Sequence, residues 1–441
     1  MISIKHPATI TKTYLFKLSI PIFFSNLFIP LVGLVDTALM GHEENIKFLA
    51  ATSIATSVIT MIFWSFGFLR MGTVGLVAQS LGKGDYREIS LITVRALNLA
   101  IFIGILIIFL QEPILLMIKK YFNTSIETHE LIRKYISIRV LSAPAELSIY
   151  VLVGLFIGLQ KTKISSLIVT FFSALNIILS VYFVNELKLN IYGVAMGTLF
   201  SSFISFFIFV IYTYNFIKKE FKVIPRYNKI FLRKKIFKLF NINFNIFIRT
   251  VLLTFAFLWF TYQSSKISED FLAVNTVLLQ FIMISSFFLD AYAFSTEGVV
   301  GYALGRKVQK SFLLAVNNSF KLSFFTGLFL SFIFIIFFKP IVNIITDLDY
   351  LRFLCYGFVI WIIIIPPIAS ICYQYDGIYI GASQTNEMRN SMIISVVIYI
   401  ILSISFVSEF GNNGLWASLL IFMILRSLTL KLYFSNILKK F

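Results

Sequence analysis

Apolar runs long enough to cross a lipid bilayer recur along this chain from one end to the other. A membrane-spanning helix needs about 20 consecutive apolar residues. The composition agrees, since 59% of the 441 residues are hydrophobic and only 13% are charged, too few to cover a soluble domain with polar groups. The alternation of polar and apolar residues that is typical of a membrane β-barrel is missing. We therefore predict an all-α membrane protein.

The apolar runs divide into twelve predicted transmembrane helices. Their approximate limits are 15–40, 48–82, 88–116, 135–160, 164–184, 191–217, 240–264, 271–303, 313–338, 353–382, 391–408 and 414–435. Several are longer than a bilayer requires, so we expect tilted or kinked helices, with kinks at Pro30, Pro144, Pro366 and Pro367. The first run has no cleavage site of small residues after it and is expected to stay as a span.

The distribution of Lys and Arg indicates how the chain crosses the membrane. If the N-terminus lies inside, the inner segments hold more than twice as many Lys and Arg residues as the outer segments. We therefore expect both termini in the cytoplasm and the protein in a bacterial-type inner membrane. A net charge of +18 suggests nucleic-acid binding in a soluble protein. Here the basic residues lie in loops as topology signals, and no nucleic-acid partner is expected.

The two halves of the chain resemble each other at a constant offset of 223 residues. Three anchors align under this offset: segment 75–82 with 298–305, Pro144 with Pro367, and segment 154–162 with 377–385. The offset pairs each span with the sixth span after it, so paired spans cross the membrane in the same direction and the repeat is parallel. We predict two pseudo-symmetric six-helix bundles around a central cleft. They are an N-terminal lobe (1–217) and a C-terminal lobe (239–441), joined by a basic cytoplasmic linker (218–238).

Asp36 is the most informative single residue because it lies inside the first predicted span. An ionised Asp near the middle of a membrane helix costs about 2.5–3.5 kcal/mol. No Lys or Arg lies one helical turn away to neutralise it. A free Asp titrates near pH 3.9, roughly, and an apolar environment disfavours its charged form. Asp36 is therefore a candidate for taking up a proton outside and releasing it inside; the alternative is a structural Asp bonded to a neighbouring polar side chain.

Three further charged residues lie in the seventh and eighth predicted spans. Asp290 and Glu297 are seven residues apart on one helix face, and Arg249 lies in the preceding span. They fit a buried salt bridge that holds the two helices together. They also fit a cleft in which Asp290 attracts cationic cargo or takes part in coupling. The offset places Asp290 on Gly67 and Asp36 on Trp259, so the halves share a scaffold and differ in their charges.

The remaining charged residues within the spans have a mainly structural interpretation. Arg139 and Glu146 are seven residues apart and are expected to face each other across a kink at Pro144. Arg70 is expected to be structural. Asp376 lies near the inner end of its span and is expected only to cap a turn.

Several segments resemble one known family of transporters. The run from Leu31 to His42, Leu-Val-Gly-Leu-Val-Asp-Thr-Ala-Leu-Met-Gly-His, is similar to the first span of MATE (multidrug and toxic compound extrusion) transporters. Phe66-Gly-Phe-Leu-Arg-Met-Gly-Thr-Val-Gly-Leu-Val-Ala-Gln79 looks like their second span. Ser286-Phe-Phe-Leu-Asp-Ala-Tyr-Ala-Phe-Ser-Thr-Glu-Gly298 and Tyr375-Asp-Gly-Ile-Tyr-Ile-Gly-Ala-Ser383 point to the DinF-like branch.

This resemblance implies a fold of twelve helices in two lobes that exports organic cations, drugs and toxic compounds. Export is driven by inward flux of H⁺ or Na⁺ through alternating access. The resemblance assigns ion coupling to Asp36 and to Asn176 in the fifth span. Many relatives have Asp one turn further on, where this chain has Ser180. Small amphipathic cations are the expected cargo and a monomer the expected state. The only ion expected besides H⁺ is Na⁺ at Asp36, with no cofactor and no other metal.

Two other classes of function compete with export. A lipid-linked saccharide flippase of the same superfamily of folds needs a cleft rich in Arg and Lys to hold pyrophosphate, and the basic residues within these spans are few. A membrane-embedded enzyme needs a catalytic motif within the spans, and no His cluster, Ser/His pairing or Gly-rich phosphate loop occurs there. We therefore rank the flippase second and do not expect an enzyme.

Overall fold

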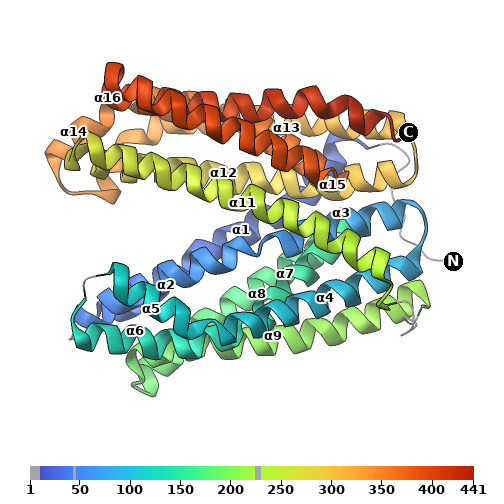
Figure 1. Ribbon diagram of the computed structural model, residues 1–441, viewed down its shortest axis with the longest axis horizontal. Coiled ribbons are helices and arrows are strands. Elements are labelled where there is room, and N and C mark those ends of the chain that lie inside the picture. Colours follow the sequence, from blue (N-terminus) through green and yellow to red (C-terminus); the bar gives the residue numbers. More distant parts are fainter. Residues whose placement is uncertain (1–9, 43–45, 123, 224–229) are drawn as a thin grey trace. The chain divides into compact units, whose positions relative to one another are not determined.

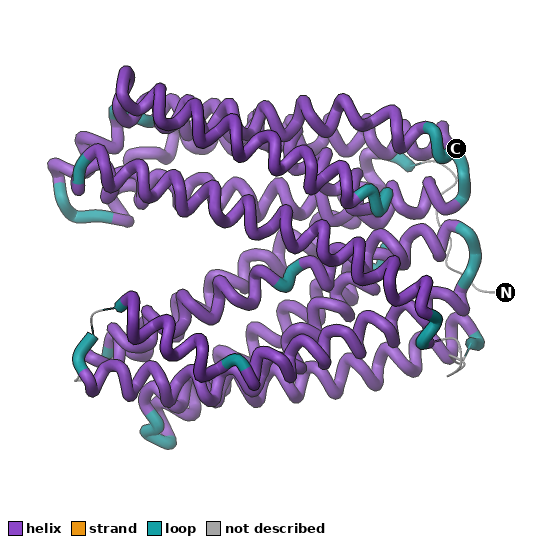
Figure 2. The backbone as a smooth tube through the Cα atoms, in the orientation of Figure 1, coloured by secondary structure: helices purple, strands orange, loops and turns teal. Residues whose placement is uncertain are grey.

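The computed structural model describes residues 10–42, 46–122, 124–223 and 230–441, which form helices and short turns with no strand among them (Figures 1 and 2). The α-helices are α1 (Lys12–Gly41), α2 (Ile46–Ser65), α3 (Phe68–Gly82), α4 (Tyr86–Phe109), α5 (Gln111–Tyr121), α6 (Ile126–Arg139), α7 (Ala143–Gly158), α8 (Thr162–Val181), α9 (Asn190–Phe221), α11 (Arg233–Ile267), α12 (Glu269–Gly305), α13 (Gln309–Ile345), α14 (Asp349–Tyr356), α15 (Val359–Gly381) and α16 (Thr385–Leu438). The prediction of an all-α protein is confirmed.

Among the described residues, eleven helical stretches are long and apolar enough to cross a membrane. The longest is α16, with 54 residues, and it contains Gly411 at φ 57° and ψ −133°. These angles are incompatible with a helix, so α16 is two helices joined at a sharp bend. Its two parts correspond to the predicted spans 391–408 and 414–435. The described part of the chain therefore has twelve spans, as predicted.

The helices gather into two compact units. Within the described residues, unit 1 comprises Pro21–Asn243, and unit 2 comprises residues 10–20 together with Phe244–Phe441. In unit 1, α7 packs against α3, α4 and α8. In unit 2, α15 packs against α12, α13 and α16. Each unit thus has one central helix on which its neighbours pack.

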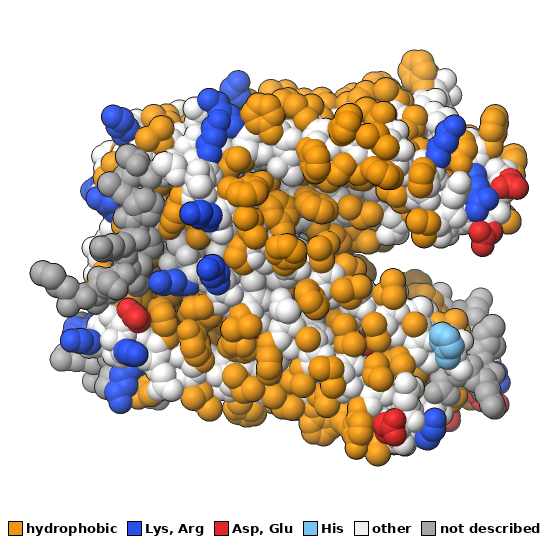
Figure 3. All heavy atoms as spheres, turned by 180° about the vertical axis from the view of Figure 1, so that it is seen from behind, with side chains coloured by type: hydrophobic (Ala, Val, Ile, Leu, Met, Phe, Trp, Pro, Cys, Tyr) orange, Lys and Arg blue, Asp and Glu red, His pale blue; other side chains and the backbone are white. Residues whose placement is uncertain are grey.

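The helix surfaces carry apolar side chains outward and small polar ones inward. In α13, Ser319, Ser323 and Ser331 are buried, whereas Phe325 and Phe329 are exposed. In each unit, hydrophobic side chains cover the middle of the face seen in Figure 3, and Lys and Arg gather toward the ends. This arrangement suits a hydrocarbon surrounding, where buried polar groups find partners inside the protein.

The internal repeat appears in both units as the same backbone contact. A Cβ atom built on Gly154 would lie 2.5 Å from the carbonyl oxygen of Arg70, and one built on Gly377 would lie 2.6 Å from the carbonyl oxygen of Ala293. Both pairs are related by the offset of 223 residues. Only glycine permits so close an approach of two helices. The repeat predicted from sequence is therefore a repeat of packing geometry.

Other features recur at the same offset. They are the close approach of Gly104 to Pro144 and of Gly327 to Pro367, and the positive φ angles of Gln160 with Ser383, Gly84 with Lys307, and Lys188 with Gly411. Helix packing and the bends between helices are thus both duplicated.

Several predicted spans have different limits in the structure, among them 88–116 and 353–382. The span predicted at 88–116 is α4, which ends at Phe109, followed by the separate helix α5. Glu112 in the first turn of α5 and Lys119 and Lys120 in its last turn complement the helix dipole, which favours a new helix there. The span predicted at 353–382 begins only at Val359, because α14 ends before Gly357.

Candidate functional site

Asp36 lies on the buried face of α1. Its exposed fraction is 5%, whereas Leu34 on the same helix is 65% exposed. Met40, one turn further on, is fully buried beside it on the same face. The helix therefore turns its carboxylate into the interior of unit 1 and its leucine outward. Such an orientation requires polar partners, because an isolated buried carboxylate is costly.

Asn176 and Ser180 lie one turn apart on α8, and both are fully buried in unit 1. The Asn176 Nδ2 atom donates a hydrogen bond to Thr198 Oγ1 on α9 at 2.9 Å. A Cβ atom on Gly197 would lie 2.4 Å from Ser180 Oγ, so the glycine leaves room for the hydroxyl group. The small residue on α9 thus allows the polar face of α8 to remain buried.

The structure brings Asp36 together with residues from two other helices, α6 and α8. Its carboxylate interacts with the Ser180 hydroxyl group and with the charge of Arg139, and its own charge acts on Tyr135. Asp36 Oδ1, Asn176 Oδ1 and Ser180 Oγ are shielded from solvent and make no hydrogen bond of standard geometry with any described residue. Buried polar atoms are nearly always paired, so the unpaired oxygens of Asp36 and Ser180, with that of Asn176 one turn away on α8, mark a candidate ligand site.

Arg139 has a partner of its own in Glu146. Arg139 Nη1 lies 2.6 Å from Glu146 Oε1, and the Ser142 hydroxyl group donates to the same carboxylate oxygen at 3.2 Å. The guanidinium also lies over the ring of Phe63, 4.8 Å from its centroid. A 3₁₀ turn at Val140–Ser142 separates α6 from α7 and lets the pair meet across the bend. Because Glu146 holds the guanidinium, Asp36 is not the main counter-ion of Arg139.

The equivalent positions in unit 2 carry no charge. The offset places Asp36 on Trp259 and Ser180 on Ser403. The Trp259 indole Nε1 donates to Ser403 Oγ at 2.8 Å. The positions of Asp36 and Ser180 in unit 1 are therefore taken in unit 2 by two neutral residues that form a hydrogen bond with each other. The candidate site is a feature of unit 1 alone.

The buried charges of unit 2 are paired differently from the prediction. Arg249 of α11 forms its ion pair with Asp376 of α15, and Arg426 of α16 donates to the same Oδ2 atom at 2.6 Å. The expectation that Asp376 only caps a turn is wrong, because this residue is buried within α15 and holds two guanidinium groups. The expectation that Arg249 pairs within the seventh and eighth spans is also wrong. A third helix supplies its carboxylate.

The structure places the other predicted site residues in separate surroundings. Asp290 on α12 lies close enough to Cys372 and Tyr373 of α15 for its charge to act on them. Glu297 is buried further along α12, and its carbonyl oxygen lies against Gly381. Arg70 is buried on α3 in unit 1, with its backbone against α7. These contacts lie on α15 for Asp290 and Glu297 and on α7 for Arg70.

Sequence reasoning missed two members of this cluster, Tyr135 and Thr198. Tyr135 is fully embedded in unit 1, and its hydroxyl group accepts a hydrogen bond from Thr56 at 3.3 Å. The spacing of Tyr135 and Arg139, one helical turn apart, is the signal that places them on one face. No signal in the sequence marks Thr198, since its role depends on how α9 packs on α8.

A parallel repeat of two six-helix units, with a polar cluster buried in one of them, defines the class of two-lobe membrane transporters. The chain matches the MatE family over residues 21–182 and 246–406. These segments fall one in each unit and cover most of the chain. The chain belongs to the MatE family, whose members are transporters and not enzymes.

Curated relatives agree with this assignment. The chain is 30% identical to DNA damage-inducible protein F of Escherichia coli over 416 residues, which are 94% of this chain and 90% of that one. It is 23% identical to the multidrug export protein MepA of Staphylococcus aureus over 194 residues, which are 44% and 43% of the two chains. The first relative supports the DinF-like branch that the motifs suggest.

Solved structures show the same fold. An outward-facing multidrug resistance MATE family transporter of the MOP superfamily has a TM-score of 0.86 at 18% identity and covers 97% of this chain and 96% of its own. A MOP superfamily transporter from Pyrococcus furiosus, whose binding pocket is described as having reverse polarity, has a TM-score of 0.87 at 18% identity, with coverage of 97% and 96%.

Proposed function

We propose that this protein is a bacterial inner-membrane antiporter that exports drugs and toxic compounds, with small amphipathic cations as cargo, driven by inward movement of H⁺. The family and the export role of a matched relative support multidrug efflux. The observation that carries the coupling proposal is the cluster around Asp36, where a buried carboxylate lies beside two further oxygen atoms without standard hydrogen bonds. In this proposal, unit 1 is the N-terminal lobe of the transporter and unit 2 is its C-terminal lobe.

The coupling step follows from the burial of Asp36. An apolar interior favours the protonated, neutral carboxyl group, and contact with water favours release of the proton. Antiport results if protonation favours one lobe arrangement and cargo favours the other, because a ligand shifts an equilibrium only by its differential affinity. Asn176 and Ser180 supply the polar surroundings in which both forms of Asp36 persist.

We prefer H⁺ to Na⁺ on two observations. The charge of Arg139 acts on Asp36 even though Glu146 is its main partner, and a positive charge there disfavours a bound Na⁺ more than a bound proton, which leaves the carboxyl group neutral. Ser180 stands where a second carboxylate would strengthen a Na⁺ site. In the part of the chain that the structure describes, no group of three or more His, Cys, Asp or Glu residues is placed to hold a metal ion.

A flippase for lipid-linked saccharides is less consistent with the buried charges. Arg139 is paired with Glu146, and Arg249 and Arg426 share Asp376. Each of these guanidinium groups already has a carboxylate partner inside its unit, although Asp376 offers a single charge to two of them. A pyrophosphate would have to displace those carboxylates, at a cost of roughly 3–5 kcal/mol for each buried pair that is broken.

Uptake of a fluorescent organic cation into inside-out vesicles tests the proposal, with H⁺ and Na⁺ gradients imposed separately. We expect uptake under the H⁺ gradient and its loss in Asp36→Asn. Asp347→Asn is the matched control, since it removes a carboxylate that is fully exposed. Full uptake by Asp36→Asn under both gradients would refute the assignment of Asp36, and uptake under the Na⁺ gradient alone would refute proton coupling.

A further inference from the structure

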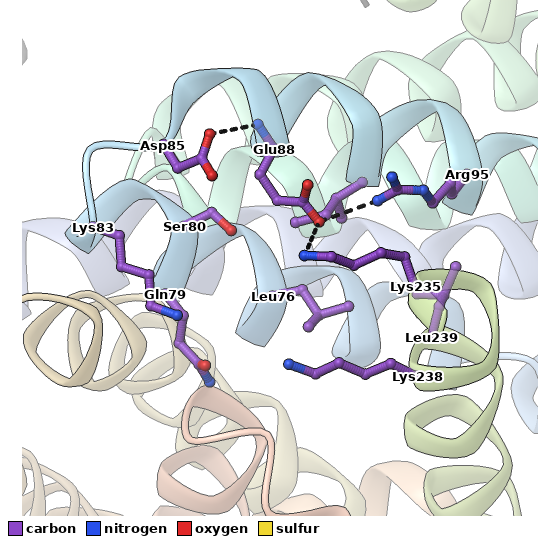
Figure 4. Close-up of a pocket in the computed structure, with 11 residues that line it drawn as sticks. Leu76, Gln79, Ser80, Lys83, Asp85, Glu88, Arg95, Lys235, Lys238 and Leu239 are labelled. Carbon is purple, nitrogen blue, oxygen red and sulfur yellow. Dashed lines mark hydrogen bonds and ion pairs between the residues drawn. The ribbon is translucent and has the colours of Figure 1, made fainter. Parts of the chain in front are cut away.

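A cavity at one end of unit 1 has no role in the transport mechanism described above. It measures about 100 Å³ and lies where α3 ends, α4 begins and α11 begins (Figure 4). A water molecule takes about 30 Å³ in the liquid, so the cavity has room for a polar group of several heavy atoms. Four cationic side chains line it: Lys83, Arg95, Lys235 and Lys238.

Both carboxylates in the lining are already engaged. Asp85 accepts a hydrogen bond from the backbone N–H of Glu88 at 3.0 Å and so caps the start of α4. Glu88 Oε1 accepts from Arg95 Nη1 at 3.1 Å and from Lys235 Nζ at 3.0 Å. Arg95 Nε also donates to the carbonyl oxygen of Ile230 at 2.7 Å, which fixes the guanidinium. One glutamate therefore serves two of the four cations.

The other two cations have no such partner. Among the described residues, the ammonium groups of Lys83 and Lys238 make no hydrogen bond or ion pair, although the charges of Lys83 and Lys235, and the opposite charge of Glu88, act on Lys238. Figure 4 shows Lys235 and Lys238 extending side by side from α11 toward the side chains of α3 and α4. Like charges held this close repel one another, and a bound anion would relieve the repulsion.

The surroundings of the cavity combine charge with exposed apolar surface. Phe237, between Lys235 and Lys238 in sequence, is 70% exposed, and Leu232 and Ile236 are exposed nearby. The lining also includes Leu76, Ile92 and Leu239. A soluble anion would make no favourable contact with these apolar side chains, whereas the acyl chains of a lipid would pack against them. The cavity lies at the end of unit 1 predicted to face the cytoplasm, where anionic lipids attract basic residues.

We propose that this cavity binds a phosphate group, held by Lys83 and Lys238, and that an anionic phospholipid headgroup supplies it. The lipid would lie with its acyl chains along the exposed apolar side chains of α11. The site does not depend on Asp36 or on the coupling ion, so failure of either proposal leaves the other standing.

Native mass spectrometry of the purified full-length protein tests the site. Dioleoylphosphatidylglycerol is titrated into wild-type protein, into Lys83→Gln/Lys238→Gln, and into the control Lys161→Gln/Lys163→Gln. The control has the same net charge and lies on the same predicted side, outside the cavity. Each lysine near an anionic headgroup contributes about 1 kcal/mol, so the cavity variant should bind this lipid about 30-fold more weakly and the control nearly unchanged. Equal melting temperatures confirm that all three proteins are folded.

Two further arms identify the source of the phosphate. Dioleoylphosphatidylcholine, which carries no net charge, should bind weakly and with no difference among the three proteins. Inorganic phosphate at millimolar concentration should displace the anionic lipid only slightly. Strong displacement that is lost in Lys83→Gln/Lys238→Gln would support phosphate recognition and assign it to a soluble anion. Unchanged lipid binding in that variant, or an equal loss in the control, would overturn the proposal.

Discussion

At the scale of single residues, the molecule differs between its halves in where it buries charge. In unit 1, the carboxylate of Asp36 lies beside oxygens that lack standard hydrogen bonds. Close to it, Arg139 and Glu146 form a buried ion pair. Unit 2 holds Asp376 between Arg249 and Arg426. A buried ion pair is costly to break, whereas the proposed coupling requires Asp36 to exchange a proton. The two kinds of site therefore predict different consequences of mutation.

Asp36→Asn is expected to lower proton-driven export at least tenfold while leaving the melting temperature equal or higher. The amide cannot take up and release a proton, yet it relieves the cost of burying an ionisable group. Export in vesicles and thermal unfolding in detergent measure the two effects. A fall in melting temperature of the size seen for a broken ion pair would show that Asp36 is structural.

Asp376→Asn is expected to destabilise the protein by roughly 3–5 kcal/mol, because it removes the negative charge that the two buried guanidinium groups share. The triple variant Arg249→Met/Asp376→Leu/Arg426→Met should recover much of the stability, since apolar replacement of a buried ion cluster is often neutral. Denaturant unfolding compares the variants. Equal stability of Asp376→Asn and wild type would contradict the pairing described here.

At the scale of helices, the close approaches of glycine to a neighbouring backbone are the contacts that the two units share. A Cβ atom on Gly104 would lie 2.4 Å from Pro144 Cα, and one on Gly327 would lie 2.7 Å from Pro367 Cα. Neither proline backbone can move without shifting its helix. By contrast, a Cβ atom on Gly33 of α1 would have no atom within 4 Å.

Gly104→Ala and Gly327→Ala should therefore each destabilise the protein by about 1–3 kcal/mol, the usual cost of overpacking. Gly33→Ala should be neutral or slightly stabilising, because alanine favours the helix. Thermal unfolding of the three variants gives the comparison. A large difference between the first two would mean that the repeat does not extend to the energetics of packing.

Sequence patterns predicted the helices and the repeat, and they placed Asp36 on a membrane helix. They failed where the answer depended on which helices are neighbours. Periodicity relates Asp290 to Glu297 along one helix, yet it carries no information that Arg249 meets Asp376 of a helix far along the chain. It could not show that Thr198 supports Asn176 for the same reason. The sharp bend at Gly411 was predicted as a loop because twelve spans require one there.

At the scale of the whole molecule, the distribution of Lys and Arg predicts which side of the membrane each loop faces. Lys163 lies at the start of α8 in a predicted inner segment, and Lys339 lies near the end of α13 in a predicted outer one. Both side chains are exposed. The two native cysteines, Cys355 and Cys372, are buried and should give little background.

A membrane-impermeant maleimide should therefore label Lys339→Cys in whole cells and Lys163→Cys only in inside-out vesicles. Labelling of both variants after permeabilisation is the control for reactivity. The opposite pattern would place the termini outside and reverse the direction in which the proposed proton gradient acts on Asp36.

Trp259 occupies in unit 2 the position that Asp36 occupies in unit 1. A transporter built from two copies of one bundle would be expected to carry two ions per transport cycle, one through each bundle. Here a neutral indole ring occupies that position in the second bundle. The proposed coupling through Asp36 therefore predicts one proton per cycle through this pair of positions, and an initial export rate that rises with the first power of proton concentration.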